Sequence, residues 1–510
     1  MRKRDRGSGL KARGIGLAAL GLALTAPSYG ASLAEKIDAA LAGDTAFWGI
    51  QVMDLSSGQT LYERNASHFF VPASNTKLFT TAMALSRLGP DFTFQTRVFA
   101  SSAPDEEGRI RGPLRLIGGG DPNLSARAIP YRIGPISGNP LGAIEDLADQ
   151  VAARGVKRIE GGIIGDDTWY LWEPFGKGWG IDDPESDDGA AVSALTINDN
   201  ALTLTILPGA HAGDLASLSF NPPIEYYQIE NQVMTAGQSA LAANPGAARI
   251  RFSRLPGSRS ARLWGAIAPG GLEVRVLGID DPAQYAALAL KSALEDRGIA
   301  VEGAAEALHE YPNQVSDPVG RPEPSPTPGG IELARRVSAP LLEDLRITDK
   351  VSENLHAELA LRAVGRARRN IGSVEAGLEE LKTFLGDVGI KPDSYDIRDG
   401  SGLARLNLVS PAAVVKLLRY MYASPHGREW LTLLPVGGQD GTLEHRFANT
   451  PASRRIYAKT GSLSHVSALS GYMQRLNGTW VVFSILVNNF NSPTGTVRGT
   501  MDRICNLIVE

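Results

Sequence analysis

The chain has a single cysteine in 510 residues, Cys505. It cannot form an intramolecular disulfide, so the fold must be stabilised by packing even in an oxidising compartment. Its position in a predicted C-terminal helix favours a buried apolar role. One cysteine and seven histidines without two-ligand spacing also argue against a metal centre, and we expect no cofactor.

The chain also lacks a large excess of basic or of acidic residues. The 51 basic and 55 acidic residues give a net charge of −4, and no Arg/Lys run follows the extreme N-terminus. We therefore expect no nucleic-acid partner. Beyond residue 30 no uninterrupted apolar run approaches the length of a membrane span, and no cysteine lies near the N-terminus to carry a lipid.

The first 30 residues have the features of an export signal. Basic residues between Arg2 and Arg13 precede a short apolar run, Gly14 to Ala26, and the small residues Ser28 and Gly30 follow. This order predicts a signal peptide over residues 1–30, cleaved after Gly30. We expect an exported, periplasmic protein.

The length of the chain exceeds one ordinary core, which predicts several domains. A short helix at residues 33–41 and a hairpin at 49–63 precede Ser74. A strand at 455–458 leads to Lys459, and strands at 468–474 and 480–487 and a helix at 496–509 follow it. Between Ser74 and Ser352 strand-like pieces alternate with Gly- and Pro-rich turns, and only residues 141–153 and 283–297 look helical. The six prolines of residues 311–330 predict a flexible or polyproline connector.

Ser74-Asn75-Thr76-Lys77 places a hydroxyl and an amine one helical turn apart, since Pro72 stops regular structure before an apolar-periodic helix that ends at Gly89. A lysine with a lowered pKa can activate such a serine, and the helix N-terminus favours a developing oxyanion. Ser-x-x-Lys alone is a weak signal, because Ser8 to Lys11 also matches it.

Two further triplets follow in order. Ser352-Glu353-Asn354 precedes a predicted helix, where a plain N-cap serine is the alternative, and Ser137 and Ser219 begin similar triplets. Lys459-Thr460-Gly461 is the only triplet of its kind; we expect it to end a strand, with Gly461 admitting a substrate backbone and Lys459 with Thr460 meeting a carboxylate. Backbone N–H groups of Ser74 and Ser462 are the expected oxyanion donors. The three motifs together predict a serine acyl-transfer site.

The motifs resemble those of the low-molecular-mass class C penicillin-binding proteins, the D-alanyl-D-alanine carboxypeptidase/endopeptidase family. Further segments carry the resemblance across the mature chain: Gly119-Gly120-Asp121-Pro122, Val192-Ser193-Ala194-Leu195, Asn198-Asp199-Asn200, Asp399-Gly400-Ser401-Gly402-Leu403, Asp440-Gly441-Thr442-Leu443 with Arg446-Phe447, and Ser462-Leu463.

The resemblance implies an α/β (α+β) transpeptidase/β-lactamase-like domain with an antiparallel five-stranded sheet flanked by helices. We assign residues 31–96 and 331–510 to it. Two nested β-rich inserted domains would comprise residues 97–200 with 285–330, and residues 201–284.

The resemblance also implies roles for the matched residues. Ser74 would be acylated, with Lys77 as its base, and Ser352 and Asn354 would pass protons and hold the acyl amide. Lys459 and Thr460 would bind the terminal carboxylate, beside Gly461 and Ser462, while Arg405 corresponds to a position that contacts the peptide stem.

Two departures from the family pattern stand out. His465 occupies a position where the family usually has glycine. The segment Asp182 to Asp188 is unusually acidic; we interpret it as a solvated loop, with recognition of a diaminopimelate amino group as the alternative.

The predicted function is a D-alanyl-D-alanine carboxypeptidase/endopeptidase that acts on peptidoglycan stem peptides and D,D-crosslinks and is acylated by β-lactam antibiotics. A β-lactamase-like or D-stereospecific esterase or amidase is one alternative, and a non-catalytic penicillin sensor that binds the cell wall is another. Whether the chain forms a homodimer stays open.

Overall fold

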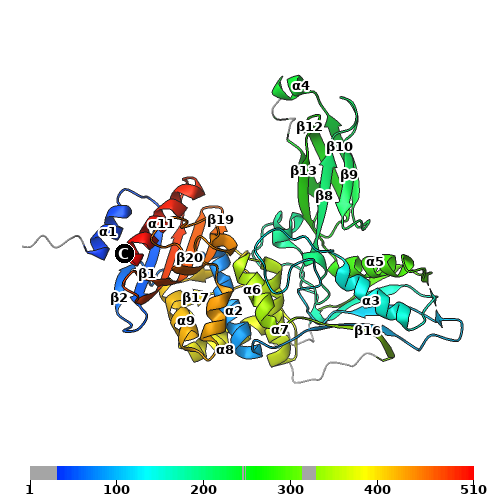
Figure 1. The fold of residues 1–510 in the computed structure, drawn as a ribbon, viewed down its shortest axis with the longest axis horizontal. Helices are drawn as coiled ribbons and strands as arrows, with labels where there is room; N and C mark the ends of the chain where they lie inside the picture. Colours follow the sequence, from blue (N-terminus) through cyan, green and yellow to red (C-terminus); the bar gives the residue numbers. More distant parts are fainter. Residues whose placement is uncertain (1–31, 244–245, 247–248, 313–328) are drawn as a thin grey trace, which may run out of the picture.

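In a computed structural model the chain forms two lobes, with a β-rich projection rising from the second (Figure 1). The structure describes residues 32–243, 246, 249–312 and 329–510. The predicted signal peptide and most of the predicted proline-rich connector lie outside the described residues. Within the described part of the chain, no helix is both long and apolar enough to cross a membrane.

The first lobe is built on a five-stranded sheet with the order β19-β20-β21-β1-β2, in which all neighbours are antiparallel. Its strands are β1 (Phe47–Asp54), β2 (Thr60–Arg64), β19 (Ile456–Leu463), β20 (Val466–Gln474) and β21 (Trp480–Asn488). Strand β1 pairs with β21 along its whole length, from Phe47 opposite Asn488 to Asp54 opposite Val481. The predicted antiparallel sheet made from both ends of the chain is confirmed.

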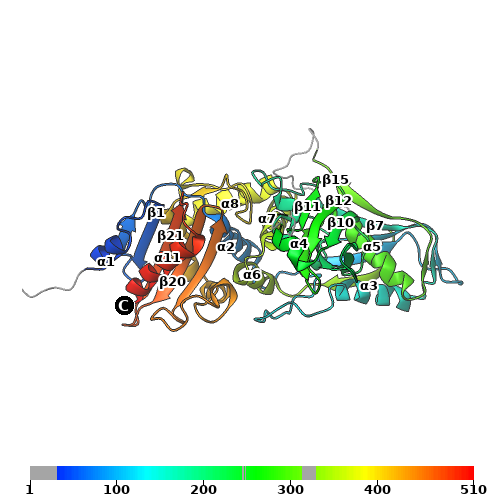
Figure 2. The same cartoon turned by 90° about the horizontal axis from the view of Figure 1, so that it is seen from above.

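Helices cover both faces of this sheet. Because successive side chains of a strand point to opposite faces, Phe483 and Ile485 of β21 belong to the cluster under α1 and α11, whereas Val482 and Leu486 belong to the opposite one. Figure 2 shows α11 lying across the strands. The helices of this lobe are α1 (Leu33–Ala40), α2 (Thr76–Leu88), α6 (Leu341–Lys350), α7 (Asn354–Arg369), α8 (Val374–Val388), α9 (Pro411–Ala423), α10 (Gly427–Leu433) and α11 (Thr494–Val509). Cys505 is buried in α11, as predicted.

The second lobe contains a mixed sheet with the order β15-β7-β5-β3-β16, against which α3 (Gly142–Ala153) and α5 (Pro282–Glu295) pack. Its strands are β3 (Gln95–Ala100), β5 (Leu114–Ile117), β7 (Ile163–Leu171), β15 (Ala305–Glu310) and β16 (Ile331–Val337). A small parallel sheet joins β4 (Arg109–Ile110), β6 (Arg158–Ile159) and β14 (Ala300–Val301). Strand β16 belongs to this sheet although we assigned residues from 331 onward to the catalytic domain; the domain division stays a prediction.

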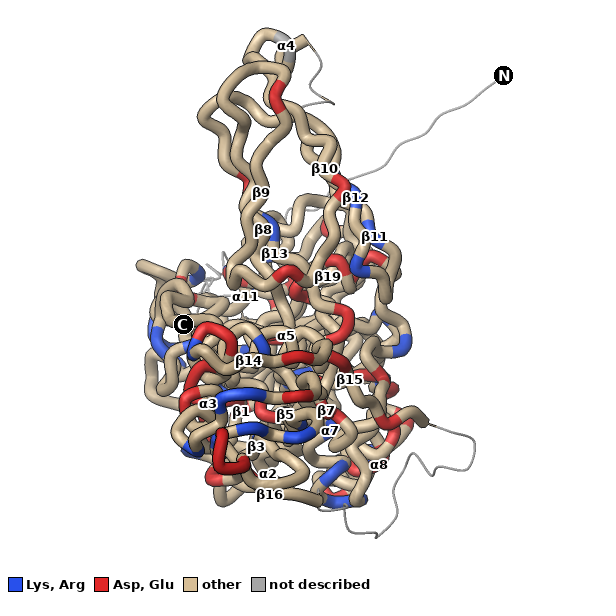
Figure 3. The backbone as a smooth tube through the Cα atoms, turned by 90° about the vertical axis from the view of Figure 1, so that its right-hand side faces the viewer, with Lys and Arg blue, Asp and Glu red and all other residues tan. Residues whose placement is uncertain are grey.

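The projection is formed by two three-stranded sheets, β13-β8-β9 and β10-β12-β11, and by the short helix α4 (Gln238–Ala243). Its strands are β8 (Ala201–Leu207), β9 (Ser217–Asn221), β10 (Gln228–Thr235), β11 (Arg251–Arg254), β12 (Ser260–Ile267) and β13 (Glu273–Gly278). Acidic and basic residues are interleaved over the second lobe, whereas the distal part of the projection carries few of either (Figure 3).

Candidate active site

Ser74 lies in the turn that leads into α2. A short 3-10 helix, η1 (Ala73–Asn75), follows Pro72 and continues directly as α2. Lys77 is therefore one turn beyond Ser74, and its Nζ donates a hydrogen bond to Ser74 Oγ at 3.0 Å. The structure brings the two side chains together as their spacing predicts.

Lys77 is fully buried, and its amine makes three hydrogen bonds. Besides Ser74 Oγ, Nζ donates to Asn354 Oδ1 at 2.5 Å and to the backbone oxygen of Ser401 at 2.8 Å. Burial lowers the pKa of Lys77 to about 8. Four carboxylates act against this pKa shift: Asp399, Glu353, Glu358 and Asp349. An amine with this pKa exchanges its proton near neutral pH, as a serine-activating base must.

Ser352 lies in the link between α6 and α7 in a left-handed backbone conformation, with φ 68°. A side chain makes this conformation costly. Ser352 is not the N-cap of α7, because Glu353 occupies that position. Instead its Oγ accepts a hydrogen bond from Lys459 Nζ at 2.7 Å. The plain N-cap alternative is therefore wrong.

Lys459 lies in the interior of β19 and is fully buried. We expected the triplet to end a strand, but β19 continues to Leu463. Burial and then the charge of Lys77 lower the pKa of Lys459 to about 7. Because repulsion between two ammonium groups is mutual, protonation of either lysine disfavours protonation of the other.

Gly461 brings strand β19 against the turn that carries Ser74. A Cβ atom at this position would lie 2.7 Å from the backbone oxygen of Pro72 and 3.1 Å from the nitrogen of Ser74. The space that a side chain of Gly461 would take is thus filled by the chain itself; the approach of a substrate backbone to Gly461 stays a prediction. Asn75 reinforces the contact, since its Nδ2 donates to the oxygen of Lys459 at 3.0 Å.

A buried carboxylate that the sequence did not single out lies behind the two lysines. Asp349, near the end of α6, accepts a hydrogen bond from the hydroxyl of Thr81 at 3.1 Å. Burial raises the pKa of Asp349 to about 7, although the positive charges of Lys459 and Lys77 act in the opposite direction. Asp349 therefore contributes a third titrating group beneath the site.

A cleft of about 440 Å³ opens in front of these groups. Six predicted residues line it: Ser74, Ser352, Asn354, Thr460, Gly461 and Ser462. Arg446 and Arg498, which we did not predict, line it as well. Arg498 donates to Ser462 Oγ at 2.8 Å, and Thr460 Oγ1 donates to Thr442 Oγ1 at 2.8 Å. The cleft thus combines the hydroxyl of Ser74 with further hydroxyl and guanidinium donors.

Comparisons with known proteins agree with this geometry. The model of the D-Ala-D-Ala carboxypeptidase 3 (S13) family matches residues 33–506. The chain belongs to this family. The D-alanyl-D-alanine carboxypeptidase of Actinomadura sp. (strain R39) is 33% identical over 475 residues, which are 90% of this chain and 82% of that protein. The D-alanyl-D-alanine carboxypeptidase DacB of Haemophilus influenzae is 25% identical, over 87% of this chain and 86% of that protein.

A solved structure supports the fold. Penicillin binding protein 4 (dacB) from Haemophilus influenzae matches with a TM-score of 0.76 and 22% identity, covering 92% of this chain and 98% of that one. These matches confirm three predictions: the transpeptidase-like fold, the family, and the activity of a serine-type D-Ala-D-Ala carboxypeptidase. The individual roles of the site residues stay predictions.

In this S13 family member, His465 fills a backbone position suited to glycine. It is the second residue of the turn between β19 and β20 and has φ 65°. Only glycine adopts this conformation without cost. The histidine is held there by its Nδ1, 2.7 Å from the oxygen of Phe490, and by its own backbone oxygen, which accepts from the N–H of Asn489.

Arg405 lies beyond the cleft rather than in it. Its side chain is exposed, and NH1 donates to the backbone oxygen of Ser464 at 3.2 Å, in the turn after β19. The residue is not among those that line the cleft, although Leu403 of the same loop is. A contact between Arg405 and a peptide stem stays a prediction.

The acidic segment 182–188 approaches the site from the second lobe. The backbone oxygen of Asp188 accepts a hydrogen bond from Asn354 Nδ2 at 2.8 Å, and Asp188 lines the cleft. Just before the segment, Trp179 Nε1 donates to Asp399 Oδ2 at 3.0 Å. Part of this segment is therefore a wall of the site, not only a solvated loop.

The loop that supplies the oxygen of Ser401 is fixed by buried carboxylates. Glu358 Oε1 accepts from the backbone N–H groups of Gly400 and Ser401 at 2.8 and 2.9 Å. Asp399 accepts from the N–H groups of Gly402 and Ala404 at 2.8 and 2.7 Å. In the sequence analysis this loop appears only as one of the segments that carry the family resemblance, and no role was predicted for it. The signal that could have identified it is its Gly-rich run after an aspartate.

Proposed function

We propose that this protein removes the terminal D-alanine from peptidoglycan stem peptides through an acyl-Ser74 intermediate, and that β-lactams acylate the same serine. The observation that carries the assignment is the 3.0 Å contact between Lys77 Nζ and Ser74 Oγ inside a fully buried amine site. We extend the proposal to D,D-crosslinks, to export by the N-terminal signal, and to action in the periplasm.

Lys77 is suited to be the general base. An ammonium group has three donors and no acceptor, so it cannot take a proton from serine until it loses one. Once neutral, it can keep donating to Asn354 Oδ1 and to the oxygen of Ser401, which directs its lone pair toward Ser74 Oγ. The lowered pKa of about 8 makes that neutral form accessible.

In the acylation step, Ser74 Oγ forms a bond to the carbonyl carbon of the penultimate D-alanine while its proton passes to Lys77. The C–N bond to the terminal D-alanine then breaks, and the leaving amine needs a proton. Ser352 lines the cleft and is hydrogen-bonded to Lys459, which makes this pair suited to deliver it. Water then hydrolyses the ester, releasing the shortened peptide and regenerating the Ser74 hydroxyl.

The oxyanion of the tetrahedral intermediate would be bound by the backbone N–H groups of Ser74 and Ser462. The close approach of Gly461 to the nitrogen of Ser74 supports this assignment, because it places strand β19 beside the nucleophile turn. Donors that are fixed before the reaction stabilise a developing charge without reorganisation.

The terminal carboxylate of the substrate would lie near Thr460 and Arg498. Lys459 is fully buried and bonded to Ser352 Oγ and the oxygen of Thr460, so its charge would act from beneath the cleft. Thr460 and Arg498 line the cleft itself and present a hydroxyl and a guanidinium. This pair would recognise a free carboxylate by charge and hydrogen bonding.

Two measurements on the purified protein test the function. Incubation with a pentapeptide ending in D-alanyl-D-alanine should release free D-alanine, and labelled penicillin should become covalently attached to the wild type but not to Ser74→Ala. Release of β-lactam hydrolysis products without D-alanine would favour a β-lactamase. Labelling without turnover of any peptide would favour a penicillin sensor. Persistent labelling of Ser74→Ala would refute the nucleophile assignment.

A further inference from the structure

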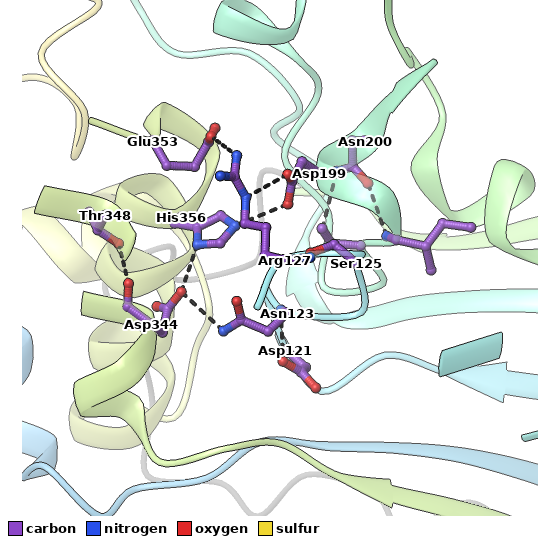
Figure 4. A network of polar contacts seen from close by, with 12 residues as sticks. Asp121, Asn123, Ser125, Arg127, Asp199, Asn200, Asp344, Thr348, Glu353 and His356 are labelled. Atoms are coloured by element: carbon purple, nitrogen blue, oxygen red, sulfur yellow. Dashed lines mark hydrogen bonds and ion pairs between the residues drawn. The ribbon is translucent and has the colours of Figure 1, made fainter. Parts of the chain in front are cut away.

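The two lobes meet at a chain of buried and half-buried charged groups next to the active site (Figure 4). At its centre Asp199 pairs with two cations: its Oδ2 lies 2.7 Å from Arg127 Nε, and its Oδ1 lies 3.3 Å from His356 Nε2. Arg127 pairs in addition with Glu353, and His356 Nδ1 lies 2.7 Å from Asp344 Oδ1. Arg127 and Asp199 belong to the inserted region, whereas Glu353, His356 and Asp344 belong to α6, α7 and their link.

The backbone that presents Asp199 is strained. Asn198, Asp199 and Asn200 have φ values of 47°, 53° and 49° in succession, although none of them is glycine. Side-chain amides hold the turn: Asn200 Nδ2 donates to the oxygen of Ala191, and Asn198 Nδ2 to the oxygen of Ala201, each at 2.8 Å. Such strain persists only where surrounding contacts impose it, and it concentrates at functional positions.

Residues of the inserted region also contact the link between α6 and α7 that carries Ser352, Glu353 and Asn354. Glu353 lies between Ser352, which has the left-handed φ of 68°, and Asn354, which accepts from Lys77. Arg127 holds the side chain of Glu353, and the backbone oxygen of Asp188 holds the amide of Asn354. The inserted region therefore contacts two of the three residues of this motif, and its ion pair to His356 fixes the first turn of α7 that follows.

We propose that the inserted domain positions the Ser352-Glu353-Asn354 link for acylation, with Arg127 as the main positioning residue and the Asp199–His356 pair as its support. This inference rests on the proposed function, because it assigns to residues outside the cleft a role in the same reaction. Ion pairs suit such a role, since they fix orientation more strictly than an apolar contact does.

Arg127 also balances the charge around Lys77. The charged groups that face Lys77 come from every element packed around it: Glu353 and Glu358 at the start of α7, Asp349 from α6, Asp399 from its loop, and Lys459 from β19. Removing the guanidinium of Arg127 leaves Glu353 uncompensated. The ammonium form of Lys77 is then favoured, and the neutral form that accepts the proton of Ser74 appears only at higher pH.

The test measures the rate of covalent labelling by penicillin between pH 6 and 10 in full-length variants. Arg127→Gln should slow labelling at pH 7 by about 10- to 100-fold, because small displacements of catalytic groups are costly. It should also shift the acidic limb of the plot of labelling rate against pH to higher pH, by about half a pH unit. Glu353→Gln should move that limb in the opposite direction. Arg127→Lys should recover part of the rate.

Arg115→Gln is the matched control. Arg115 also pairs with a buried carboxylate of the inserted region, Asp166, but it does not reach α7. The control should label at the wild-type rate. Wild-type labelling by Arg127→Gln, or equal slowing in Arg115→Gln with an unmoved pH profile, would overturn the inference while the proposed function stands. A wild-type protein that neither binds penicillin nor releases D-alanine would overturn both.

Discussion

The Nζ atom of Lys459 lies 2.7 Å from Ser352 Oγ, although 107 positions separate the two residues. Because the serine oxygen accepts this hydrogen bond, its own proton is free to point elsewhere, and Ser352 lines the cleft. A hydroxyl with a buried cation on one side and substrate on the other can pass a proton between them.

Replacing Ser352 by alanine should therefore slow acylation strongly. The expected loss in the labelling rate with penicillin is about 10²- to 10⁴-fold, the usual contribution of a positioned proton-transfer group. Ser464→Ala, an exposed serine in the turn after β19, is the control and should label normally. Equal rates for both variants would exclude Ser352 from proton transfer.

Acylation should rise with pH and level off near the pKa of Lys77. The amine accepts the proton of Ser74 only in its neutral form, and burial lowers the pKa of Lys77 to about 8. The rate should thus increase about tenfold per pH unit below that value and change little above it. A labelling rate independent of pH between 6 and 8 would contradict a lysine base.

Gly461→Ala should impair acylation while leaving the fold intact. The added methyl group would lie 2.7 Å from the oxygen of Pro72 and must separate β19 from the nucleophile turn. A displacement of this kind can cost about 10²-fold in rate. The control Gly386→Ala, in α8, adds a methyl with no atom within 4 Å and should react like the wild type.

Arg498→Gln should weaken recognition of the substrate carboxylate. A charged hydrogen bond contributes about 1.5–3 kcal/mol, so kcat/KM for a free D-alanyl-D-alanine peptide should fall about 10- to 100-fold. The same peptide with an amidated C-terminus should be cleaved equally slowly by both proteins. Arg503→Gln, an exposed arginine of the same helix, is the control. An unchanged preference for the free carboxylate would exclude Arg498 from its recognition.

His356 should make stability depend on alkaline pH. Burial alone would lower the pKa of His356, but the carboxylates of Asp344 and Asp199 raise it to about 10. Because the folded-state pKa exceeds the unfolded value of about 6.5, the protonated histidine contributes fully below that pH. The contribution is then lost progressively as the pH rises toward about 10.

His356→Gln leaves the buried carboxylate of Asp344 without its cation and Asp199 with Arg127 alone, which should cost about 3–5 kcal/mol near neutral pH. The difference in Tm between wild type and variant should narrow from pH 7 to pH 10, and thermal unfolding at a series of pH values measures it. A constant difference would mean that His356 does not carry a proton in the folded protein.

The sequence predicted the parts of the site that depend on local spacing. Ser74 and Lys77 lie one helical turn apart, so a helix alone brings them together. Asp349 and Arg498 were not predicted as site residues, because the sequence of their helices does not indicate which residues they contact in the folded protein. Their places are set by tertiary packing.

One error has a clear physical source. We expected the triplet with Gly461 to end a strand, and glycine is indeed uncommon in strand interiors. Here the glycine is required inside the strand, because the backbone of Pro72 and Ser74 occupies the space of a side chain. A neighbouring backbone that is hundreds of residues away in the chain leaves no local signal.

The pairing of Phe47 with Asn488 sets a condition on when the protein can become active. The helix carrying Ser74 emerges early during synthesis, yet the strands that complete its sheet are among the last to be made. Until those strands are made, Ser74 has no Lys459, no Gly461 and no cleft beside it. An unfinished chain therefore lacks these parts of the site, and we expect it to react with neither a peptide nor a β-lactam before the sheet is complete.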